Sequence, residues 1–593
     1  MDHREIKETP IWQLFQKGQS YGHRVNRFRD TDRNYRMYNG DQWAGANLGG
    51  IEPVQINFIK SIVKYKISVI HDNLYGIVYE SMNFEDKAFR NTADMVCEML
   101  TNYAIRVWER EKMDYKCRRI TKDSAINDEG ILFIDFDAKE KIPRNEIIKK
   151  NDIYYGNEND DDIQSQPYIL IKKRMPVSNA IDFALARGLP ASKKEFIVGD
   201  NDTFEESGDA AKQEIDDMVT IVYKFYRVDD TVKFSIATKW VTICEDKDLG
   251  IALYPIVHMV WEEKEGSARG EGEVRQLIPN QLEVNKTEMR RVLTARSQAY
   301  PHMVVDESKI ENSEDLESVG AVIRTKGQTV DDVRKVIGTI APAQMSPDVK
   351  ILLDELIQTS RELAGAGETA TGQVDPEAAS GRAILAVQQA SRAPMTEQKE
   401  NFKNFVEDVA RIWLEYVIAH SQKGFNLQKK VTDPESGKEM TVVENVPQET
   451  LKSLRADVKV EITPKSVYDR FAVEQTLENL LTLGLLSAQR VGELKIYANL
   501  LPDDSVAPKR AILEAVKMIE DNQKKIAQLQ ANAQLMQQRA NNYLMEGPEA
   551  QAADVNHAQK KAQLMQLIQQ AAAAKQHNNQ NISSKEKELD EAS

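Results

Sequence analysis

The sequence predicts an α+β fold that is predominantly helical. Amphipathic helical patterns recur along most of the 593 residues, alternating strand patterns gather in the N-terminal half, and residues 521–593 are rich in Ala and Gln. At about 150 residues per domain, this length corresponds to about four domains, or to fewer elongated ones. With the 28 glycines added, the hydrophobic content of 41% becomes about 46%, that of ordinary folded chains, so most of the sequence is expected to fold.

Charge and cysteine content exclude several classes of protein. The chain carries 78 Lys and Arg against 93 Asp and Glu, and its formal net charge of −15 argues against a general nucleic-acid-binding surface. Cys97, Cys117 and Cys244 are too few and too scattered for a disulfide framework or a zinc cluster, as expected of a protein made in a reducing compartment.

No segment predicts a membrane span or a secretion signal. The N-terminus, MDHREIKETP, is charged and lacks the apolar stretch of a signal peptide. Apolar stretches such as 251–260 are interrupted and are far shorter than the roughly 20 residues that a span needs. We therefore expect a soluble protein that does not contact a membrane.

The first 270 residues combine helices with strands. Apolar residues at three- and four-residue spacing predict helices over 56–70 and 95–107, after a turn-rich stretch at 39–53. Alternating patterns predict strands at 130–138, 168–172 and 219–228.

Two charged segments of this part have a composition that could suit a ligand-binding site. The run 157–162 (NENDDD) lacks the glycine turn of a calcium loop, so we interpret it as a solvated acidic loop. An arginine-rich stretch near the N-terminus would suit nucleic acid or, as we prefer, the charged face of an interface helix. It contains Arg24, Arg27, Arg29, Arg33 and Arg36, close to Tyr21, Tyr35 and Tyr38.

A long amphipathic helix is predicted to follow the glycine-rich segment 266–272. Its apolar residues keep a helical period up to Pro301, which ends it, and Pro279 either starts the helix or kinks it. A second amphipathic helix begins at Pro347 and stops at Gly365.

A small α/β insert of about forty residues separates these two helices. Strand patterns are present at 303–305 and 321–324, and a short helix is expected near 330–337.

A Gly/Thr/Ala-rich segment, 365–379, follows the second helix. It has almost no large apolar residue to bury, so we expect a mobile loop. From Ser380 a long helical pattern runs to about Ser421, with a bend expected at Pro394. A hairpin around the turn 433–438 comes next.

The C-terminal part predicts a strand at 458–462 and helices through 477–486, followed by a low-complexity tail. In the tail, two seven-residue rows through Ile526 and Leu529 form one heptad seam of modest quality. Such a helix needs partner helices, because its Ala/Gln composition cannot fill a globular core.

Motifs of enzymatic chemistry are lacking. The sequence has no phosphate-binding G-x-x-x-x-G-K-[ST], no H-E-x-x-H and no G-x-S-x-G. The letters of a dinucleotide fingerprint occur at 365–370, but they follow a helix rather than a strand. The eight histidines never fall within one helical turn of each other. We therefore expect no catalytic residue, no metal site and no cofactor.

The order of these parts resembles the portal proteins of tailed bacteriophages, closest to those of short-tailed phages. The resemblance rests on the mixed α/β body, GEGEVRQLIPNQLEVNKTEMRR, the small insert, the returning helix, and the Gly/Thr loop with DPEAASGRAILAVQQ. Within it, the residues 281–285 and 380–381 are suggestive rather than diagnostic.

The resemblance implies a portal-type architecture. Mapped onto this chain, it gives the N-terminal part of a wing at 1–270, a first stem helix at 271–300, a clip at 301–346, a second stem helix at 347–364, a tunnel loop at 365–379, the C-terminal part of the wing at 380–470, a crown at 471–520, and a helical barrel or tail at 521–593.

The resemblance also implies a function. The chain would form a ring of about twelve subunits at one capsid vertex, through which a terminase motor packages double-stranded DNA and from which the DNA is later ejected. Its partners would be further copies of itself, the major capsid protein and scaffold, terminase, and tail adaptors. It would act in the virion, and in the host cytoplasm during assembly, and would not be an enzyme.

Three groups of site residues follow from this mapping. The tunnel loop would contribute Gly365, Gly367, Glu368, Thr369, Thr371, Gly372 and Gln373. Basic residues of the first stem helix, Arg290, Arg291 and Arg296, would damp DNA motion or, as we prefer, make contacts with the capsid or between subunits. The clip would dock terminase or an adaptor through Glu314, Asp315, Glu317, Arg324 and Lys326.

The charge of the chain agrees with this interpretation independently. A channel lined by many Lys and Arg would bind DNA tightly and in a salt-dependent manner, whereas an acidic chain repeated around an axis repels the backbone and lets it slide. Two alternatives remain: another virion structural protein, such as a tail adaptor or scaffold, and a nucleotidyl or phosphoryl transferase. A tail adaptor or scaffold protein would not explain the paired helices with an insert between them. A transferase would require phosphate-binding or metal-binding motifs, which the sequence lacks.

Overall fold

The computed structural model describes most of the first 464 residues and a short part of the remainder. The described residues are 7–47, 52–82, 87–200, 217–299, 303–312, 314–315, 322, 324–326, 337–340, 345–367, 393–432, 439–454, 456–464, 525–526 and 528–538. The chain divides into two compact units, Met1–Thr463 and Pro464–Ser593.

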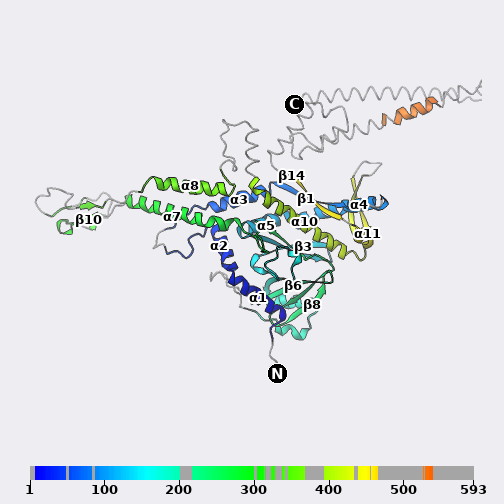
Figure 1. Cartoon of the computed structure of the whole chain (residues 1–593), viewed down its shortest axis with the longest axis horizontal. Helices are drawn as coiled ribbons and strands as arrows, with labels where there is room; N and C mark the ends of the chain where they lie inside the picture. The colour runs from blue at the N-terminus through cyan, green and yellow to red at the C-terminus, as the bar shows by residue number, and fades with distance from the viewer. Residues whose placement is uncertain are drawn as a thin grey trace, which may run out of the picture. The chain divides into compact units, whose positions relative to one another are not determined.

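Two helices of the first unit, α1 (Pro10–Arg24) and α3 (Phe58–Ile70), begin at side-chain caps. Thr9 Oγ1 accepts the N–H of Trp12 ahead of a proline at the first helical position, and Asn57 Oδ1 accepts the N–H of Lys60. The helices, shown in Figure 1, are α1 (Pro10–Arg24), α2 (Arg27–Asn39), α3 (Phe58–Ile70), α4 (Lys87–Arg110), α5 (Met113–Ile126), α6 (Val177–Ala186), α7 (Glu273–Ala299), α8 (Asp348–Leu363), α10 (Thr396–Ala419) and α11 (Gln448–Ser453).

Two antiparallel sheets form the β part of the body. The larger has the strand order β4-β5-β6-β7-β8 and the smaller the order β3-β2-β9. Their bounds are β2 (Glu129–Asp137), β3 (Ile142–Ile148), β4 (Ile153–Tyr155), β5 (Ile169–Pro176), β6 (Met218–Val228), β7 (Thr231–Ala237), β8 (Thr242–Asp248) and β9 (Ile256–Val260).

Three further strand pairs join other parts of the first unit. Strand β1 (Asn73–Ser81) pairs with the distant β14 (Ala456–Pro464). Hairpin β12–β13 consists of Phe425–Thr432 and Glu439–Val446, and the pair β10–β11 consists of Met303–Val305 and Ile337–Thr339.

The core lies where α5 and α10 meet the smaller sheet. Gly130 on β2 makes room for α5, because a Cβ there would lie 2.3 Å from the carbonyl oxygen of Ile120. On α10, Trp413 donates to Asn145 Oδ1 at 3.1 Å and Tyr416 donates to the carbonyl of Ile134 at 3.0 Å. These bonds satisfy the polar ends of two fully buried aromatic rings.

Many elements expected from the sequence are present. The helices predicted at 56–70 and 95–107, the strands at 130–138, 168–172, 219–228, 303–305 and 458–462, and the hairpin around 433–438 correspond to α3, α4, β2, β5, β6, β10, β14 and β12–β13. The helices expected on either side of 301–346 correspond to α7 and α8.

Other expectations are wrong or lie outside the described residues. Strand β1 interrupts a region read as helix, because its apolar residues also fit a short strand. At 321–324, Val322 and Arg324 are irregular. Pro394 lies in a 3₁₀ turn immediately before α10, and the part of the expected helix that precedes it, residues 380–392, lies outside the described residues. The predicted helix near 330–337 ends in β11 at Ile337, and its other residues, like those of the helix at 477–486, lie outside the description.

In the second unit, the described residues 525–526 and 528–538 are helical, as the heptad pattern predicts. Ile526, Leu529 and Ala533 are half-buried on one side, while Leu535 and Met536 are exposed. Among the described helices of the chain, none is long and apolar enough to cross a bilayer.

Candidate functional site

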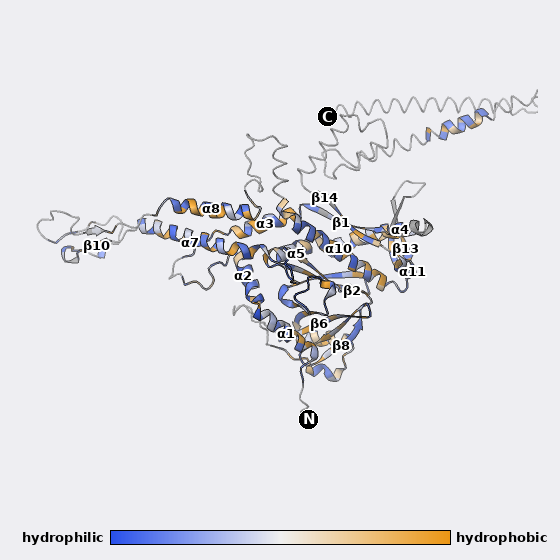
Figure 2. Cartoon of the chain, in the orientation of Figure 1, coloured by the Kyte–Doolittle hydropathy of each residue, from blue (hydrophilic) through white to orange (hydrophobic). Residues whose placement is uncertain are grey.

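Helices α7 and α8 pack against each other along their length and form the candidate site's framework (Figure 1). Leu353 and Ser360 of α8 are buried, and Asn280 on α7 donates to Ser360 Oγ at 3.0 Å. Pro279 lies inside α7, so it does not start the helix. Figure 2 shows hydrophilic residues interleaved with the hydrophobic ones on both helices. This helix pair is called the α7–α8 arm below.

Two amides on α7 fix the arm to the body. Gln281 Oε1 accepts the N–H groups of Phe58 and Ile59 at 3.1 and 3.3 Å, at the start of α3. Asn285 Oδ1 accepts the N–H of Ile56 at 3.1 Å. Both amides are buried, so they satisfy backbone donors that water does not reach. These residues lie within the stretch 281–285 that carried the resemblance.

An ion pair fixes the first residue of α7. Lys66 on α3 pairs with Glu273 at 2.6 Å, and both side chains are buried. Trp261 also donates to the Glu273 carboxylate, at 3.3 Å. The carboxylate stands at the N-terminus of α7, where the helix dipole favours a negative charge.

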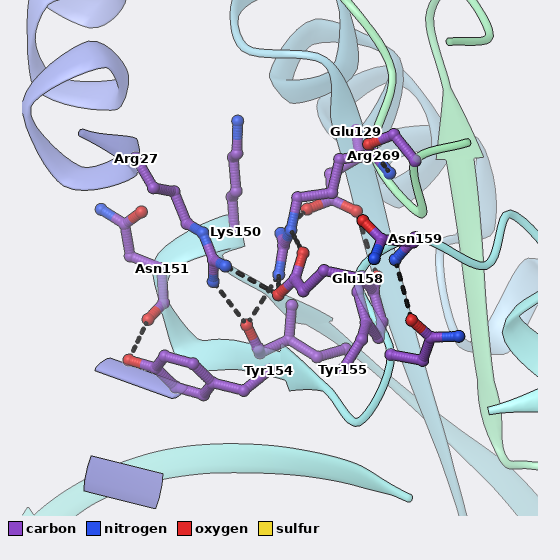
Figure 3. A network of polar contacts seen from close by, with 12 residues as sticks. Arg27, Glu129, Lys150, Asn151, Tyr154, Tyr155, Glu158, Asn159 and Arg269 are labelled. Atoms are coloured by element: carbon purple, nitrogen blue, oxygen red, sulfur yellow. Dashed lines mark hydrogen bonds and ion pairs between the residues drawn. The ribbon is translucent and has the colours of Figure 1, made fainter. Parts of the chain in front are cut away.

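A larger buried network lies immediately before α7 (Figure 3). Arg269 pairs with Glu129 on β2 and with Glu158, whose Oε2 it reaches at 2.7 Å. Arg27 on α2 pairs with the other oxygen of Glu158, also at 2.7 Å. Tyr155 donates to Glu129 at 3.0 Å. The network thus joins α2, β2, the loop after β4 and the segment that leads into α7.

The network shifts the pKa values of its members. Burial lowers the pKa of the Arg269 guanidinium, but the carboxylates of Glu129 and Glu158 outweigh burial and raise it well above its usual range. Burial raises the pKa of Glu158, yet Arg269 and Arg27 overcome this and lower it. Nearby, burial and the positive charge of Arg269 lower the pKa of His258 to about 4. His258 is therefore neutral at pH 7.

Sequence reasoning missed this network. The expectation that 157–162 is a solvated loop holds for Asp161 and Asp162, which are exposed, but is wrong for Glu158. The prediction of a charged helix face is wrong for Arg27, which is buried. The only signal was Arg269 within the glycine-rich 266–272, where small residues let chains approach closely.

The basic residues expected on the first stem helix are on the surface of α7. Arg290 pairs with Glu283 at 3.6 Å and Arg291 with Glu288 at 3.1 Å. Arg296 is exposed and has no ion-pair partner among the described residues. The Arg290–Glu283 pair is exposed on both sides and contributes little to stability, whereas Glu288 is only 13% exposed, so Arg291 covers a partly buried carboxylate.

Part of the expected docking cluster is brought together. Asn312 donates to Asp315 at 3.0 Å and accepts the backbone N–H of Arg324 at 2.7 Å. Lys326 donates its backbone N–H to the carbonyl of Lys309 at 2.9 Å. Glu314 is exposed beside Asp315, and Glu317 lies outside the described residues.

Gly365 ends α8. Its φ of +67° is in the left-handed region, which glycine adopts without strain, and its N–H reaches the carbonyl of Glu362 at 2.9 Å. A Cβ at Gly365 would lie 3.3 Å from Pro394, so the chain returns to this point before α10. Gly367 is half-buried. The other expected loop residues, Glu368, Thr369, Thr371, Gly372 and Gln373, lie outside the described residues.

Comparison with known proteins identifies the class of protein to which this fold belongs. The sequence matches the family of phage P22-like portal proteins over residues 172–581, well over half of the chain. The chain therefore belongs to this portal family. Membership implies assembly into an oligomeric ring with other virion components, and hence a place in the phage particle.

Other comparisons add less. No protein with a curated description matches the sequence significantly. Among solved structures, one similar chain comes from the neck of an empty GTA particle computed with C6 symmetry, with 9% identity and a TM-score of 0.32 over 80% of this chain and 94% of that chain. Such a score is too low to transfer a fold or a residue role.

Proposed function

We propose that this chain forms the portal channel at one capsid vertex, of the short-tailed phage type. Double-stranded DNA would pass through a twelvefold ring during packaging and ejection. The α7–α8 arm would be the stem, the segment with β10 and β11 the clip, and residues 365–379 a loop facing the channel. The remaining body would be the wing, followed by a crown and a helical barrel.

The observation that carries this proposal is the α7–α8 arm itself. The chain leaves the body through a helix of 27 residues, forms the small β10–β11 pair, and returns through a helix of 16 residues. The base of the arm is fixed by Gln281, Asn285 and the Lys66–Glu273 pair. In a family of portal proteins, an arm held this firmly suits a channel wall.

Electron micrographs of the purified protein test the proposal. Closed rings with a central pore are expected in head-on views. Class averages would also determine the symmetry. A monomer that forms no ring at any concentration would contradict the portal channel and favour the alternative of a tail adaptor or scaffold protein.

The clip would dock the terminase motor and later the tail adaptors. Asp315 and Arg324 are held close together by Asn312, so opposite charges share one small surface. Charge reversal at Glu314, Asp315 and Glu317 should impair docking in a pull-down with terminase while rings still form. Reversal at Glu245, an exposed acid on β8 outside the clip, is the control and should leave docking unchanged.

We further propose that the chain hydrolyses no nucleotide, since the packaging energy would come from the separate motor. The absence of a phosphate-binding loop in the sequence supports this. ATPase activity of purified rings that is lost on mutation of a residue of this chain would refute it.

A further inference from the structure

A cavity of about 820 Å³ lies in the body, apart from the α7–α8 arm. Its walls come from α2, from α5, from the end of β3 and from the 3₁₀ turn Lys150–Asp152. A volume of this size is typical of a small-ligand site. The cavity is called the α2–α5 cavity below.

The α2–α5 cavity carries an excess of positive charge. Lys150 and Lys172 are neutralised by Asp128 and Asp152, at 2.5 and 3.2 Å. Four further lining cations form no ion pair with any carboxylate in the described part of the chain: Arg118, Arg119, Lys122 and Lys149.

Only one lining carboxylate among the described residues is left without an ion pair to oppose these four cations. It is Asp123, which accepts a hydrogen bond from Tyr35 at 2.7 Å and interacts electrostatically with three of them. A protein with a net charge of −15 thus concentrates positive charge on one concave surface. Such local concentration attracts anions against the sign of the whole chain.

Three cations on α5 share one face of the helix with an exposed aromatic ring. Tyr115, Arg118, Arg119 and Lys122 follow the spacing i, i+3, i+4, i+7, which places them on one face of the helix. The Tyr115 side chain is 66% exposed. A ring of this exposure next to guanidinium groups offers a stacking surface for a base as well as contacts for phosphates.

The residues that line the cavity include one with a buried, unpartnered hydrogen-bond acceptor. Asn127 lines both the α2–α5 cavity and a smaller cavity of about 240 Å³ beside it. Asn127 is only 6% exposed, and its side-chain oxygen Oδ1 has no hydrogen-bond partner among the described residues. A buried acceptor of this kind fits a hydroxyl or amino group, which a nucleotide carries in addition to its phosphates.

We propose that the α2–α5 cavity binds an unpaired segment of nucleic acid. Arg118, Arg119 and Lys149 contact its phosphates, and Tyr115 stacks on a base. A cavity of this volume admits an unpaired nucleotide but not a duplex. The proposal concerns a site outside the arm and does not depend on ring assembly.

Fluorescence anisotropy with a labelled single-stranded 12-mer tests the proposal on the full-length protein. Arg119→Gln combined with Lys149→Gln should weaken binding at least tenfold. The slope of log K against log salt should fall by about 1.4, since each phosphate contact on a single strand accounts for about 0.7. The matched control, Lys193→Gln with Lys194→Gln, removes two exposed lysines outside the cavity and should change neither quantity.

Tyr115→Ala separates stacking from charge. Loss of the Tyr115 ring should weaken binding of the 12-mer about tenfold. The slope of log K against log salt should stay unchanged, because stacking involves no counterion release. Circular dichroism of each variant should match that of the unmodified protein, because the substituted side chains are exposed or partly exposed.

Competitors distinguish the source of the phosphates and the class of ligand. Inorganic triphosphate should compete only weakly, and a duplex 12-mer should bind more weakly than the single strand. Triphosphate binding as tight as the 12-mer, preference for an oligoglutamate peptide, preference for the duplex, or no binding of any probe would each overturn the proposal. Ring formation is measured separately, so failure here leaves the portal function intact.

Discussion

The body and the α7–α8 arm use charge in opposite ways. In the body, the side chains of Arg269, Glu129 and Glu158 are at most 13% exposed and bond to one another. On the arm, Arg290 and Glu283 are 65% and 47% exposed. Charges of the first kind hold segments in place, whereas charges of the second kind leave the fold nearly unchanged and face the solvent.

This difference indicates where the molecule is rigid. A buried charge that loses its partner is strongly unfavourable, so the network before α7 fixes the direction in which the arm leaves the body. Exposed pairs exchange readily with water and salt. The arm can therefore change its charged contacts without disturbing its base.

The largest effect is expected for Arg269→Met. It leaves Glu129 buried without its cation, and the free energy of unfolding should fall by about 3 to 5 kcal/mol. Urea unfolding followed by tryptophan fluorescence measures it. Arg290→Met on the arm is the matched control and should change stability by less than about 1 kcal/mol. Equal losses in the two variants would remove the distinction between body and arm.

Gln281→Leu should have the next largest effect. The substitution leaves the N–H groups of Phe58 and Ile59 without an acceptor, so the free energy of unfolding should fall by about 2 kcal/mol. Gln276→Leu changes an exposed residue of the same helix and should be nearly neutral. If Gln281→Leu matches this control in the same urea titration, the base of the arm is held by packing alone.

The sequence predicts the arm better than its base. Helices α7 and α8 have regular apolar periods, and Gly365 marks the end of α8, so local pattern was sufficient. The network that orients them joins residues up to 242 positions apart, from Arg27 to Arg269. No local pattern indicates such pairs, because Arg27 and Glu158 each lie in a run of charged residues.

Candidate site residues were likewise predictable from the sequence where a local helical pattern places them, and not where distant segments come together. The positions of Arg290, Arg291 and Arg296 on the surface of α7 follow from helical spacing. The α2–α5 cavity was not foreseen, because its cations come from α5 and from the end of β3, whose approach depends on tertiary packing. The arginine-rich stretch contributes none of these cations: its Arg27 is buried in the network before α7, and its Tyr35 lines the cavity.

A pH titration sharpens the comparison by measuring what a neutral histidine of the body contributes to stability. His258 has its pKa lowered to about 4 in the folded state, below the usual 6.5, so the unfolded chain binds the proton first as the pH falls. The stability due to neutral His258 is fully present above about pH 6.5 and is lost towards pH 4.

Urea unfolding between pH 7 and pH 4 measures this loss, with His258→Gln as the comparison. The variant should lose less stability over the same range. The raised pKa of Glu129, caused by burial, acts in the opposite direction and is common to both proteins. Identical pH profiles would mean that His258 is protonated without cost in the folded state.

The smallest effect on stability is expected on the arm. Replacing Arg290 and Arg296 together with Gln should change the free energy of unfolding by less than about 1 kcal/mol, because the pair of Arg290 is exposed and Arg296 has no ion pair among the described residues. If these cations contact a neighbouring subunit, the variant's rings should dissociate at lower salt than unmodified rings. If they contact DNA instead, ring dissociation should stay unchanged while DNA retention in filled particles falls. A loss of more than about 2 kcal/mol in the isolated chain would show that the arm, like the body, depends on its charges to fold.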